Sequence, residues 1–316
     1  MVSQEDSVIL NKQAIERGLF SATSYKTLVD EEKKQGTYNF ETICMPPIEK
    51  RKKNINYSFL DERGIVKKYM NNKSVYVEKG DVIIGKTLTK SNKNGEEEVF
   101  DCSYVINHGE EGYIDRVVET VTPNGYKMIK VIIRNQKIPE IGDKFASRSA
   151  QKGTCGLILP QEDMPFTQDG MCPDILINSL CIPSRMTISQ ILETVLGKAC
   201  CMEGTFGDAT PFSSNSTNIA EQICERLKYH GFQRQGWETM YNGMTGEPLE
   251  AQIFMGPVFY QRLKHMVSDK MHSRSQGHVT SLTRQPLEGR SRSGGKSLPQ
   301  WYVKVLLVLR HIVQHF

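Results

Sequence analysis

The sequence lacks several features that would assign it to a familiar class of protein. None of its 8 cysteines forms a Cys-x-x-Cys pair and no histidine stands at finger spacing from them, so we expect no zinc site. The most apolar run, 303–313, is short and interrupted by charges, which predicts no membrane span. Residues 1–10 contain Glu5 and Asp6 and no long apolar core, so a signal peptide is not expected. The scattered cysteines and 13 methionines fit a reducing, intracellular compartment, the nucleus or the cytoplasm, better than a secreted protein.

The chain also has little excess charge of either sign. Its formal net charge is only +4 with 24% charged residues, so any surface that binds nucleic acid has to be local rather than general. We find no internal repeat and no low-complexity segment in the sequence. With 316 residues, of which 38% are hydrophobic, the chain is long enough for two domains that each bury a core.

Apolar patterning predicts strands in two parts of the chain. Short β-rich runs at 82–84, 113–118 and 128–133, separated by glycines and turn residues, indicate twisted antiparallel strands. Two further runs at 156–159 and 175–177 lie among long stretches rich in Gly, Pro and Ser. This arrangement is typical of strands in a barrel that carries long functional loops.

Three helices are predicted in the second half of the chain. The first covers residues 187–196, where apolar residues recur at helical spacing after Thr187, which we expect to be its N-cap. The second covers residues 218–230 and ends before Gly231. A third is expected over residues 258–269. Together these patterns predict a mixed β and α fold.

The strongest chemical signal is a basic run between residues 137 and 153. Lys137, Lys144, Arg148 and Lys152 lie within sixteen residues, against two acids. From Lys144 onward the spacers are mostly Ser, Ala and Gly, which let a backbone approach a polyanion while long cationic side chains reach its phosphates. Composition alone leaves a solvated basic loop as an equal alternative.

The order of short motifs along the chain resembles a known family. GDKFASR at 142–148, followed by QKGT at 151–154, looks like the hybrid-binding signature of the second-largest, β-type subunit of multisubunit DNA-directed RNA polymerases. Further blocks of that pattern are EDMPF at 162–166, PD at 173–174, IPSRMT at 182–187, GDATPF at 207–212, MYNG at 240–243, QIFMGP at 252–257, YQRL at 260–263, DKMHSR at 269–274 and TRQPLEGRSR at 283–292. The resemblance covers about residues 3 to 295, is weakest between 21 and 110, and is closer to the eukaryotic, archaeal and large-DNA-virus versions than to the bacterial one.

The resemblance implies catalytic roles for three cations. Lys144 and Lys152 match lysines that lie beside the RNA 3′ end and the incoming nucleotide, where they would neutralise phosphate charge during nucleotidyl transfer. Arg185 matches an arginine that contacts the triphosphate, and its fork of donors suits a phosphate. A structural alternative is that Arg185 pairs with Asp174 or Glu193 to hold its loop.

Metal binding is implied for the acidic pair Glu5 and Asp6. These residues match the acids near a second magnesium ion, which is shared with substrate phosphates and therefore needs few protein carboxylates. Without the resemblance, two acids before an apolar run fit a helix N-terminal charge equally well. The carboxylates that hold the first magnesium belong to the largest subunit in this family and are not expected here.

A second basic set lies near the end of the resemblance. In the family this segment lies against the RNA–DNA hybrid and leads into a switch loop, so its contacts should be to backbone and shape rather than to base edges. A flexible basic loop is the alternative. The set consists of Lys270, His272, Arg274, Arg284, Arg290 and Arg292.

The resemblance also implies a division of the chain. Residues 1–20 and 131–295 would form a hybrid-binding domain of the double-psi β-barrel type with inserted helices, and residues 21–130 a mainly β wall or flap-like region. Implied partners are template DNA, the RNA–DNA hybrid, ribonucleoside triphosphates, the largest polymerase subunit and the other polymerase subunits. A viral source would place the protein in virions or in a cytoplasmic virus factory.

At both ends the resemblance stops inside a motif. The family has several hundred residues before the QEDS block at 4–7, and continues after residue 292 into a zinc-bearing clamp, whereas residues 296–316 match nothing in it. We therefore expect one exon or one piece of an interrupted gene, with a genuinely split subunit as the alternative. Two other hypotheses stay open: a non-catalytic nucleic-acid-binding module and an inert fragment.

Overall fold

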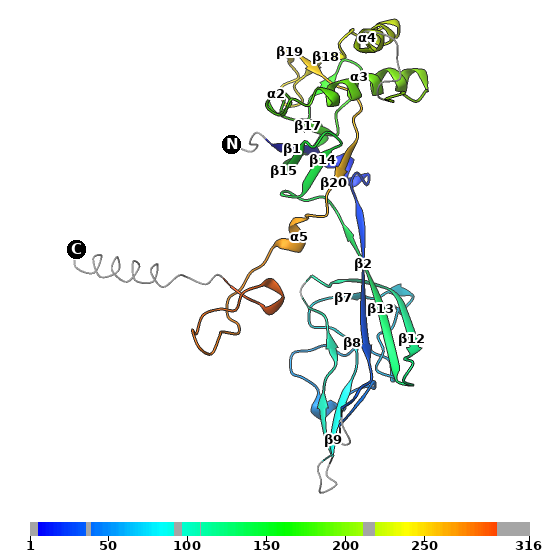
Figure 1. The fold of residues 1–316 in the computed structure, drawn as a ribbon, viewed down its shortest axis with the longest axis vertical. Helices are drawn as coiled ribbons and strands as arrows, with labels where there is room; N and C mark the ends of the chain where they lie inside the picture. Colours follow the sequence, from blue (N-terminus) through cyan, green and yellow to red (C-terminus); the bar gives the residue numbers. More distant parts are fainter. Residues whose placement is uncertain (1–5, 36–38, 92–96, 108, 211–218, 296–316) are drawn as a thin grey trace, which may run out of the picture. The chain divides into compact units, whose positions relative to one another are not determined.

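The computed structural model describes residues 6–35, 39–91, 97–107, 109–210 and 219–295. Contacts divide the chain into two compact units, Met1–Met266 and Val267–Phe316, which are described separately. Strands dominate the first unit, with helices inserted after β17 (Figure 1). The predicted mixed β and α class is therefore confirmed. None of the helices in the described ranges is long and apolar enough to cross a membrane.

The longest strands form a four-stranded antiparallel sheet. Its order is β2 (Ala22–Glu31), β13 (Lys127–Lys137), β12 (Gly112–Val121) and β7 (Tyr76–Val77). The strands predicted at 113–118 and 128–133 lie within β12 and β13 and are confirmed. On β13 the side chains alternate, so that Ile129, Val131 and Ile133 are buried and the residues between them are more exposed.

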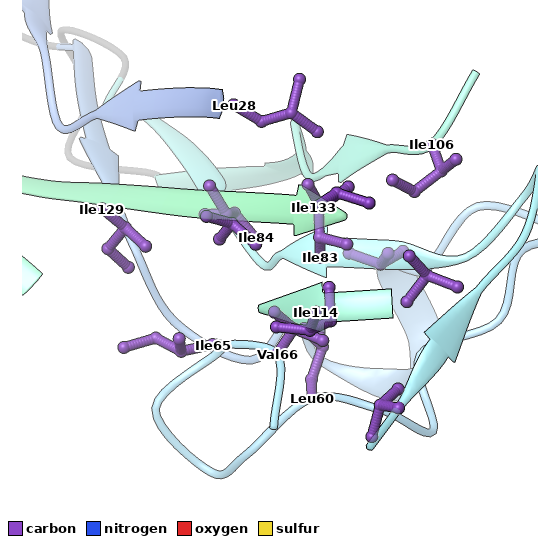
Figure 2. Close-up of a cluster of buried hydrophobic side chains, with 14 of the residues drawn as sticks. Leu28, Leu60, Ile65, Val66, Ile83, Ile84, Ile106, Ile114, Ile129 and Ile133 are labelled. Carbon is purple, nitrogen blue, oxygen red and sulfur yellow. The ribbon is translucent and has the colours of Figure 1, made fainter. Parts of the chain in front are cut away.

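A hydrophobic core covers the buried face of this sheet. It contains 16 buried hydrophobic residues, all between Leu28 and Ile133. Figure 2 shows most of them. The core includes the strand predicted at 82–84, which is confirmed as β8 (Val82–Ile84) and whose three side chains are all fully buried. β8 pairs with β11 (Tyr104–Val105), and a hairpin of β5 (Tyr69–Met70) and β6 (Lys73–Ser74) lies nearby in sequence.

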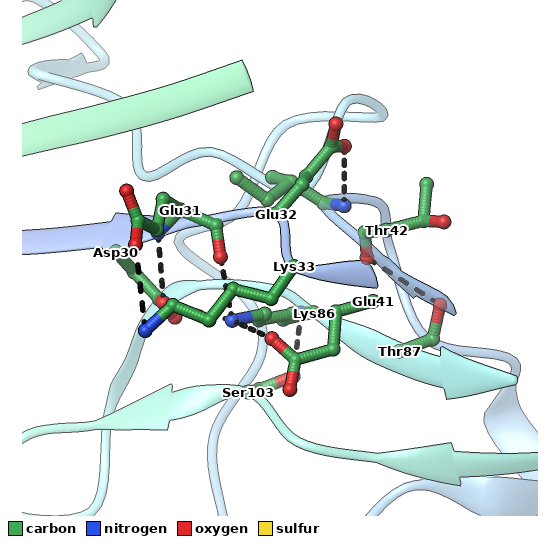
Figure 3. A network of polar contacts seen from close by, with 10 residues as sticks. Asp30, Glu31, Glu32, Lys33, Glu41, Thr42, Lys86, Thr87 and Ser103 are labelled. Atoms are coloured by element: carbon green, nitrogen blue, oxygen red, sulfur yellow. Dashed lines mark hydrogen bonds and ion pairs between the residues drawn. The ribbon is translucent and has the colours of Figure 1, made fainter. Parts of the chain in front are cut away.

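A second four-stranded sheet is fastened to β2 by a buried lysine. The order of the sheet is β10 (Glu97–Asp101), β9 (Thr87–Ser91), β4 (Asn39–Thr42) and β3 (Lys34–Gln35). Lys86 is only 6% exposed and pairs with the carboxylates of Asp30, at 2.9 Å, and Glu41 (Figure 3). Burial by itself would lower the pKa of Lys86, but the hydrogen bonds that its ammonium donates to Glu41 and Asp30 outweigh burial and raise the pKa, so the ammonium stays charged.

The strands that carry the basic run form a five-stranded sheet. Its order is β17 (Ile175–Ile177), β1 (Ser7–Asn11), β15 (Lys152–Leu159), β14 (Lys144–Ser147) and β20 (Tyr260–Arg262). The predicted strands at 156–159 and 175–177 are confirmed within β15 and β17. β1 pairs in parallel with β15, and its Leu10 packs in a small core with Phe145 and Cys155.

Two helices and a small sheet follow. The helix predicted over 187–196 is confirmed and longer, as α3 (Ile188–Glu203), and the helix predicted over 218–230 is confirmed as α4 (Ile219–Tyr229). Thr187 is the N-cap residue of α3, as predicted, but its side chain makes no capping hydrogen bond, and its hydroxyl accepts from Gln151. A three-stranded sheet of β16 (Phe166–Thr167), β18 (Trp237–Tyr241) and β19 (Pro248–Phe254) belongs to the same part. The other short helical segments are α1 (Lys12–Glu16), α2 (Cys181–Arg185) and η2 (Gln161–Asp163), together with η1 (Ile48–Lys50), which contacts β10.

The predicted helix over 258–269 is wrong. The segment contains β20, which pairs along β14, and only its last residues begin the short helix α5 (Val267–Lys270). Over so few residues the apolar spacing fits a strand as well as a helix, and the edge of β14 offers backbone partners. The second unit comprises α5, a loop with an isolated bridge between Val279 and Pro286, and η3 (Arg290–Arg292).

Candidate functional site

Lys144 and Lys152 lie on the same face of the five-stranded sheet. In the antiparallel register Lys144 stands opposite Thr154, and Ala146 stands opposite Lys152. Opposed residues project from one face, as do residues two apart on a strand, so the two lysines are diagonal neighbours with backbones roughly 7–8 Å apart. Within the described ranges neither ammonium group forms an ion pair with a carboxylate. Lys152 is exposed and Lys144 is half-buried.

β1 brings Asp6 to the same two strands. The amide of Thr154 donates to the Asp6 carbonyl at 3.2 Å, and Ser7 is in register with Thr154. Gly153 makes this approach possible, because a Cβ there would lie 2.4 Å from the Asp6 carbonyl oxygen and 2.9 Å from Val8 Cγ2. A predicted metal ligand and two predicted phosphate-binding lysines thus come together from segments far apart in the sequence.

Arg185 adjoins this group from α2. Its Nη2 forms an ion pair with Asp6 Oδ1, and its Nη1 donates to the carbonyl of Ala150 at 3.4 Å. The predicted alternative partners, Asp174 and Glu193, form ion pairs with other arginines. The alternative that Arg185 pairs with Asp174 or Glu193 is therefore wrong, and its side chain instead pairs with Asp6, the acid expected at the metal.

Arg148 has a partner of its own. Its guanidinium pairs with Glu193 at 2.6 Å and lies over the Phe259 ring, 5.1 Å from the ring centroid. The side chain of Arg148 is still 62% exposed, so one edge of the fork faces solvent. This arrangement ties the loop after β14 to α3.

A buried ion pair next to Lys144 was not found from the sequence. Arg262 Nη2 lies 2.6 Å from Asp143 Oδ2, with side chains 6% and 1% exposed. Arg262 also donates to the carbonyls of Phe20, at 3.1 Å, and Lys137, at 2.6 Å. The predicted nucleic-acid contact Lys137 therefore has its backbone fixed by this arginine. The sequence contains only a weak signal for this ion pair, namely an acid, Asp143, immediately before Lys144 in a basic run.

Cys155 is excluded as a nucleophile. Burial raises the pKa of its thiol to about 11, and the negative charge of Asp143 adds to the effect. At neutral pH the sulfur is protonated and packs as a small apolar group in the core beside Phe145.

In the second unit, two predicted nucleic-acid contacts hold the loop itself. Arg274 donates from Nη1 to the carbonyl of Ser293 at 2.9 Å and from Nη2 to that of His278 at 3.0 Å. His272 Nε2 lies 2.7 Å from the carbonyl oxygen of Gly294, which requires the nitrogen to be the donor. These contacts close the segment on itself.

The remaining cations of that unit differ in exposure. Arg290 is half-buried and donates to the carbonyl of Ser268 at 3.3 Å. Lys270, Arg284 and Arg292 are exposed. The predicted set therefore divides into residues that shape the loop and residues that face solvent.

Metal-binding capacity in the described residues is limited. They contain no group of three or more His, Cys, Asp or Glu side chains that could hold an ion. The Asp6 carboxylate is 54% exposed and offers hard oxygen atoms, which fits a magnesium ion held mainly by other ligands. Glu5, its predicted partner, lies outside the described residues, as do residues 296–316.

Comparison with known proteins gives a consistent result. The family model described as RNA polymerase Rpb2, domain 6, matches residues 2–292. A probable DNA-directed RNA polymerase II subunit RPB2 homolog of Invertebrate iridescent virus 3 is 50% identical over 295 residues, covering 93% of this chain and 25% of the relative. The DNA-directed RNA polymerase II subunit RPB2 of Encephalitozoon cuniculi is 48% identical, over 93% of this chain and 26% of its own length.

A plant relative agrees with these two. The DNA-directed RNA polymerase II subunit 2 of Arabidopsis thaliana is 45% identical over 300 residues, which again cover 93% of this chain. The chain spans about a quarter of the length of each of these relatives. With a family model that matches almost its whole length, the chain belongs to the RNA polymerase Rpb2 domain 6 family.

Proposed function

We propose that the chain supplies part of the catalytic centre of a DNA-directed RNA polymerase, which adds ribonucleotides to RNA on a DNA template. The observation that carries this proposal is the meeting of Lys144, Lys152, Arg185 and Asp6, which come from β14, β15, α2 and the segment before β1. Three cations beside one carboxylate suit a nucleoside triphosphate that arrives with a divalent cation.

Each cation has a distinct task in this proposal. Lys144 and Lys152 stabilise negative charge that builds on phosphate oxygens as the new bond forms and pyrophosphate leaves. Arg185 grips the triphosphate with two parallel N–H donors. In the free protein its fork is engaged by Asp6, so substrate binding exchanges that ion pair for phosphate contacts.

Magnesium enters the proposal as a shared ion. When bound, it would neutralise triphosphate charge and align the phosphates. Asp6 and Glu5 would each contribute one oxygen ligand. The first magnesium would be held by the largest subunit. In this proposal the residues of this chain bind and orient the substrate, and the metal centre is completed by the largest subunit.

Contacts to the RNA–DNA hybrid belong to the remaining cations. Exposed Lys270, Arg284 and Arg292 would touch the nucleic-acid backbone, which carries no sequence information and suits an enzyme that copies any template. Lys137 and Arg148 would contribute beside the sheet, and His272, Arg274 and Arg290 would hold the loop that presents the others.

The domain roles follow the same proposal. Residues 1–20 and 131–295 would form the hybrid-binding domain with its double-psi β-barrel, and residues 21–130 the wall or flap-like region. Partners would be the template, the hybrid, ribonucleoside triphosphates, the largest subunit and the other polymerase subunits. The competing function is a nucleic-acid-binding module in which the same lysines only hold DNA or RNA.

Lysine substitutions in the assembled polymerase separate these two functions. Lys144→Ala and Lys152→Ala should each slow single-nucleotide addition on an RNA–DNA scaffold by about 10²–10³-fold, because each removes one preorganised charge from the reacting phosphates. Scaffold binding should change little. Rapid-quench kinetics measures the first quantity and a filter-binding titration the second.

Lys228→Ala is the matched control for loss of one positive charge, since Lys228 is an exposed residue of α4. Its addition rate should equal that of the unmodified enzyme. Weaker scaffold binding with unchanged turnover in the Lys144 and Lys152 variants would support the binding module and contradict the catalytic role.

A further inference from the structure

The loop between β14 and β15 is joined to α2 through one buried amide. Gln151, which immediately precedes Lys152, is only 5% exposed. Its Nε2 donates to the carbonyl of Cys181 at 3.1 Å and to the hydroxyl of Thr187. Because the Cys181 carbonyl can only accept a hydrogen bond, the side-chain group of Gln151 that faces it must be the NH2. Both hydrogens of this NH2 are donated, one to each acceptor.

These two hydrogen bonds bracket Arg185. Cys181 is the first residue of α2 and Arg185 its last, and Thr187 begins the turn into α3. A single side chain therefore spans both ends of the helix that carries the arginine. Because Gln151 is covalently next to Lys152, it sets the position of one proposed phosphate-binding group relative to the other.

The backbone at the same loop supports this link. Ala150 adopts a left-handed conformation, with φ of 59°, and its carbonyl accepts both from the Lys152 amide at 3.0 Å and from Arg185 Nη1 at 3.4 Å. A non-glycine residue in this region of φ is strained and persists only where surrounding contacts hold it. The Gln151 amide is a buried contact that does so.

Other contacts between this loop and α3 lie at the surface. Ser149 Oγ is 3.2 Å from Ser189 Oγ, and the pair between Arg148 and Glu193 has an arginine that is 62% exposed. Exposed polar contacts of this kind contribute little because water competes for the same groups. Loss of the buried Gln151 hydrogen bonds should cost more than loss of these surface contacts. The buried amide and its acceptors have no water to replace a missing partner.

We infer that Gln151 is a positioning residue, which holds Lys152 and Arg185 at the separation that a nucleoside triphosphate requires. The inference rests on the proposed function of these two cations. Gln151 itself touches no substrate. Its side chain acts by fixing α2 against the end of the β14–β15 loop, so its loss changes how two charges cooperate rather than how many charges there are.

Substitution of Gln151 in the assembled polymerase tests the inference. Gln151→Leu keeps the approximate size and removes both donors, and should lower kcat/KM for nucleotide addition by about 10–100-fold, as expected for displaced catalytic groups. The KM for the ribonucleoside triphosphate should rise through Arg185, and kcat should fall through Lys152. Scaffold binding, measured in parallel, should be unchanged.

A second pair of variants guards against misfolding at residue 151. Thr187→Val removes one acceptor at nearly constant shape and should cause a smaller loss in the same direction, whereas Thr187→Ser keeps the hydroxyl and should restore the rate. Ser189→Ala is the surface control, since it removes the exposed contact to Ser149, and should stay within about twofold. Equal rates for Thr187→Val and Thr187→Ser would overturn the inference.

Double variants distinguish positioning from general stability. In an Arg185→Ala background, Gln151→Leu should no longer raise the KM, whereas the fall in kcat through Lys152 should remain, so the two losses in kcat/KM should be less than additive. Fully additive losses, or a lower melting temperature with normal kinetics in the assembled fraction, would overturn the inference. If Lys152→Ala and Arg185→Ala are themselves silent, the proposed function fails; if they are impaired and Gln151→Leu is not, only this inference fails.

Discussion

Gly153 stands where two strands of the site approach more closely than side chains allow. The Asp6 carbonyl and the Val8 side chain occupy the space into which a Cβ would project. Its backbone is not in the left-handed region, so space, and not backbone strain, requires glycine here. The same contact keeps Asp6 beside Lys152.

Gly153→Ala should therefore damage both stability and the site. We expect a loss of about 1–3 kcal/mol in the free energy of unfolding, typical of overpacking, together with slower nucleotide addition in the assembled enzyme. Urea unfolding of the chain measures the first effect. Gly125→Ala is the control, because Gly125 has open space around its Cβ position and a φ of +83°, so only backbone strain of about 1–2 kcal/mol is expected there. Unchanged stability of Gly153→Ala would show that β1 can move away freely.

Single residues also show the limit of prediction from sequence. Lys144, Lys152 and Arg185 could be chosen because long cationic side chains among small residues, in a family motif, point to phosphate. Arg262 and Gln151 could not, because their importance lies in buried partners distant in the chain, which a motif does not reveal. The residue type alone does not show whether a charged or amide side chain faces water or a buried carbonyl.

At the scale of elements, the end of β10 is fixed by one carboxylate. Asp101 accepts from the Tyr57 hydroxyl, from the Ser103 amide at 2.9 Å and from the Lys52 amide at 3.3 Å. Burial alone would raise the pKa of Asp101, but hydrogen bonds from Ser103 and Tyr57 outweigh it and lower the pKa. The Tyr57 hydroxyl responds in the opposite sense: burial, followed by its hydrogen bond to Asp101, raises its pKa to about 12.

This corner should contribute to acid sensitivity. A carboxyl whose pKa is lowered by folding stabilises the native state above its unfolded value, about 3.9, and that contribution disappears as the pH falls through the folded value. Asp101→Asn should be less stable than the unmodified chain at pH 7, and the difference should shrink as the pH falls below about 4. Urea midpoints at a series of pH values provide the measurement. A difference that is constant with pH would contradict the role of the ionised carboxylate.

Element prediction succeeded where the pattern was long or continuous. The helices over 187–196 and 218–230 and the strand over 82–84 have side-chain spacing that fits one structure well. The segment 258–269 does not, and pairing with the exposed edge of β14 decided its structure. Thr187 is the N-cap residue that its small polar side chain predicted, yet its hydroxyl accepts from the buried amide of Gln151 and does not cap the helix.

At the scale of the whole molecule, apolar burial is unevenly distributed. The core beside β13 has 16 buried hydrophobic residues, whereas the core beneath the five-stranded sheet has five and the core between α3 and α4 has four. Among residues 267–295, buried positions are few, and the backbone is held mainly by turns and side-chain contacts. Local stability should follow the same order.

Hydrogen exchange on the full chain tests this order and the hypothesis of an inert fragment. Amides of β12 and β13 should exchange slowest, and those of residues 267–295 fastest, because opening them exposes little apolar surface. Exchange of the same chain in concentrated urea gives the unprotected reference. Rates equal to that reference throughout would show that the isolated chain does not fold, and would support the inert fragment.

The parallel pairing of β1 with β15 also affects how the molecule is made. Ser7 and its partner Thr154 are 147 positions apart, so a ribosome working at roughly 5–20 residues per second delivers the second strand roughly 7–30 s after the first. Val8 and Leu10, which are buried in the finished protein, cannot pair with β15 during that interval. The part of the chain between β1 and β15 contains the core of 16 residues and has time to fold first. A nascent chain would therefore acquire the proposed nucleotide site late, and a chaperone that shields its first strand would act before any substrate could bind.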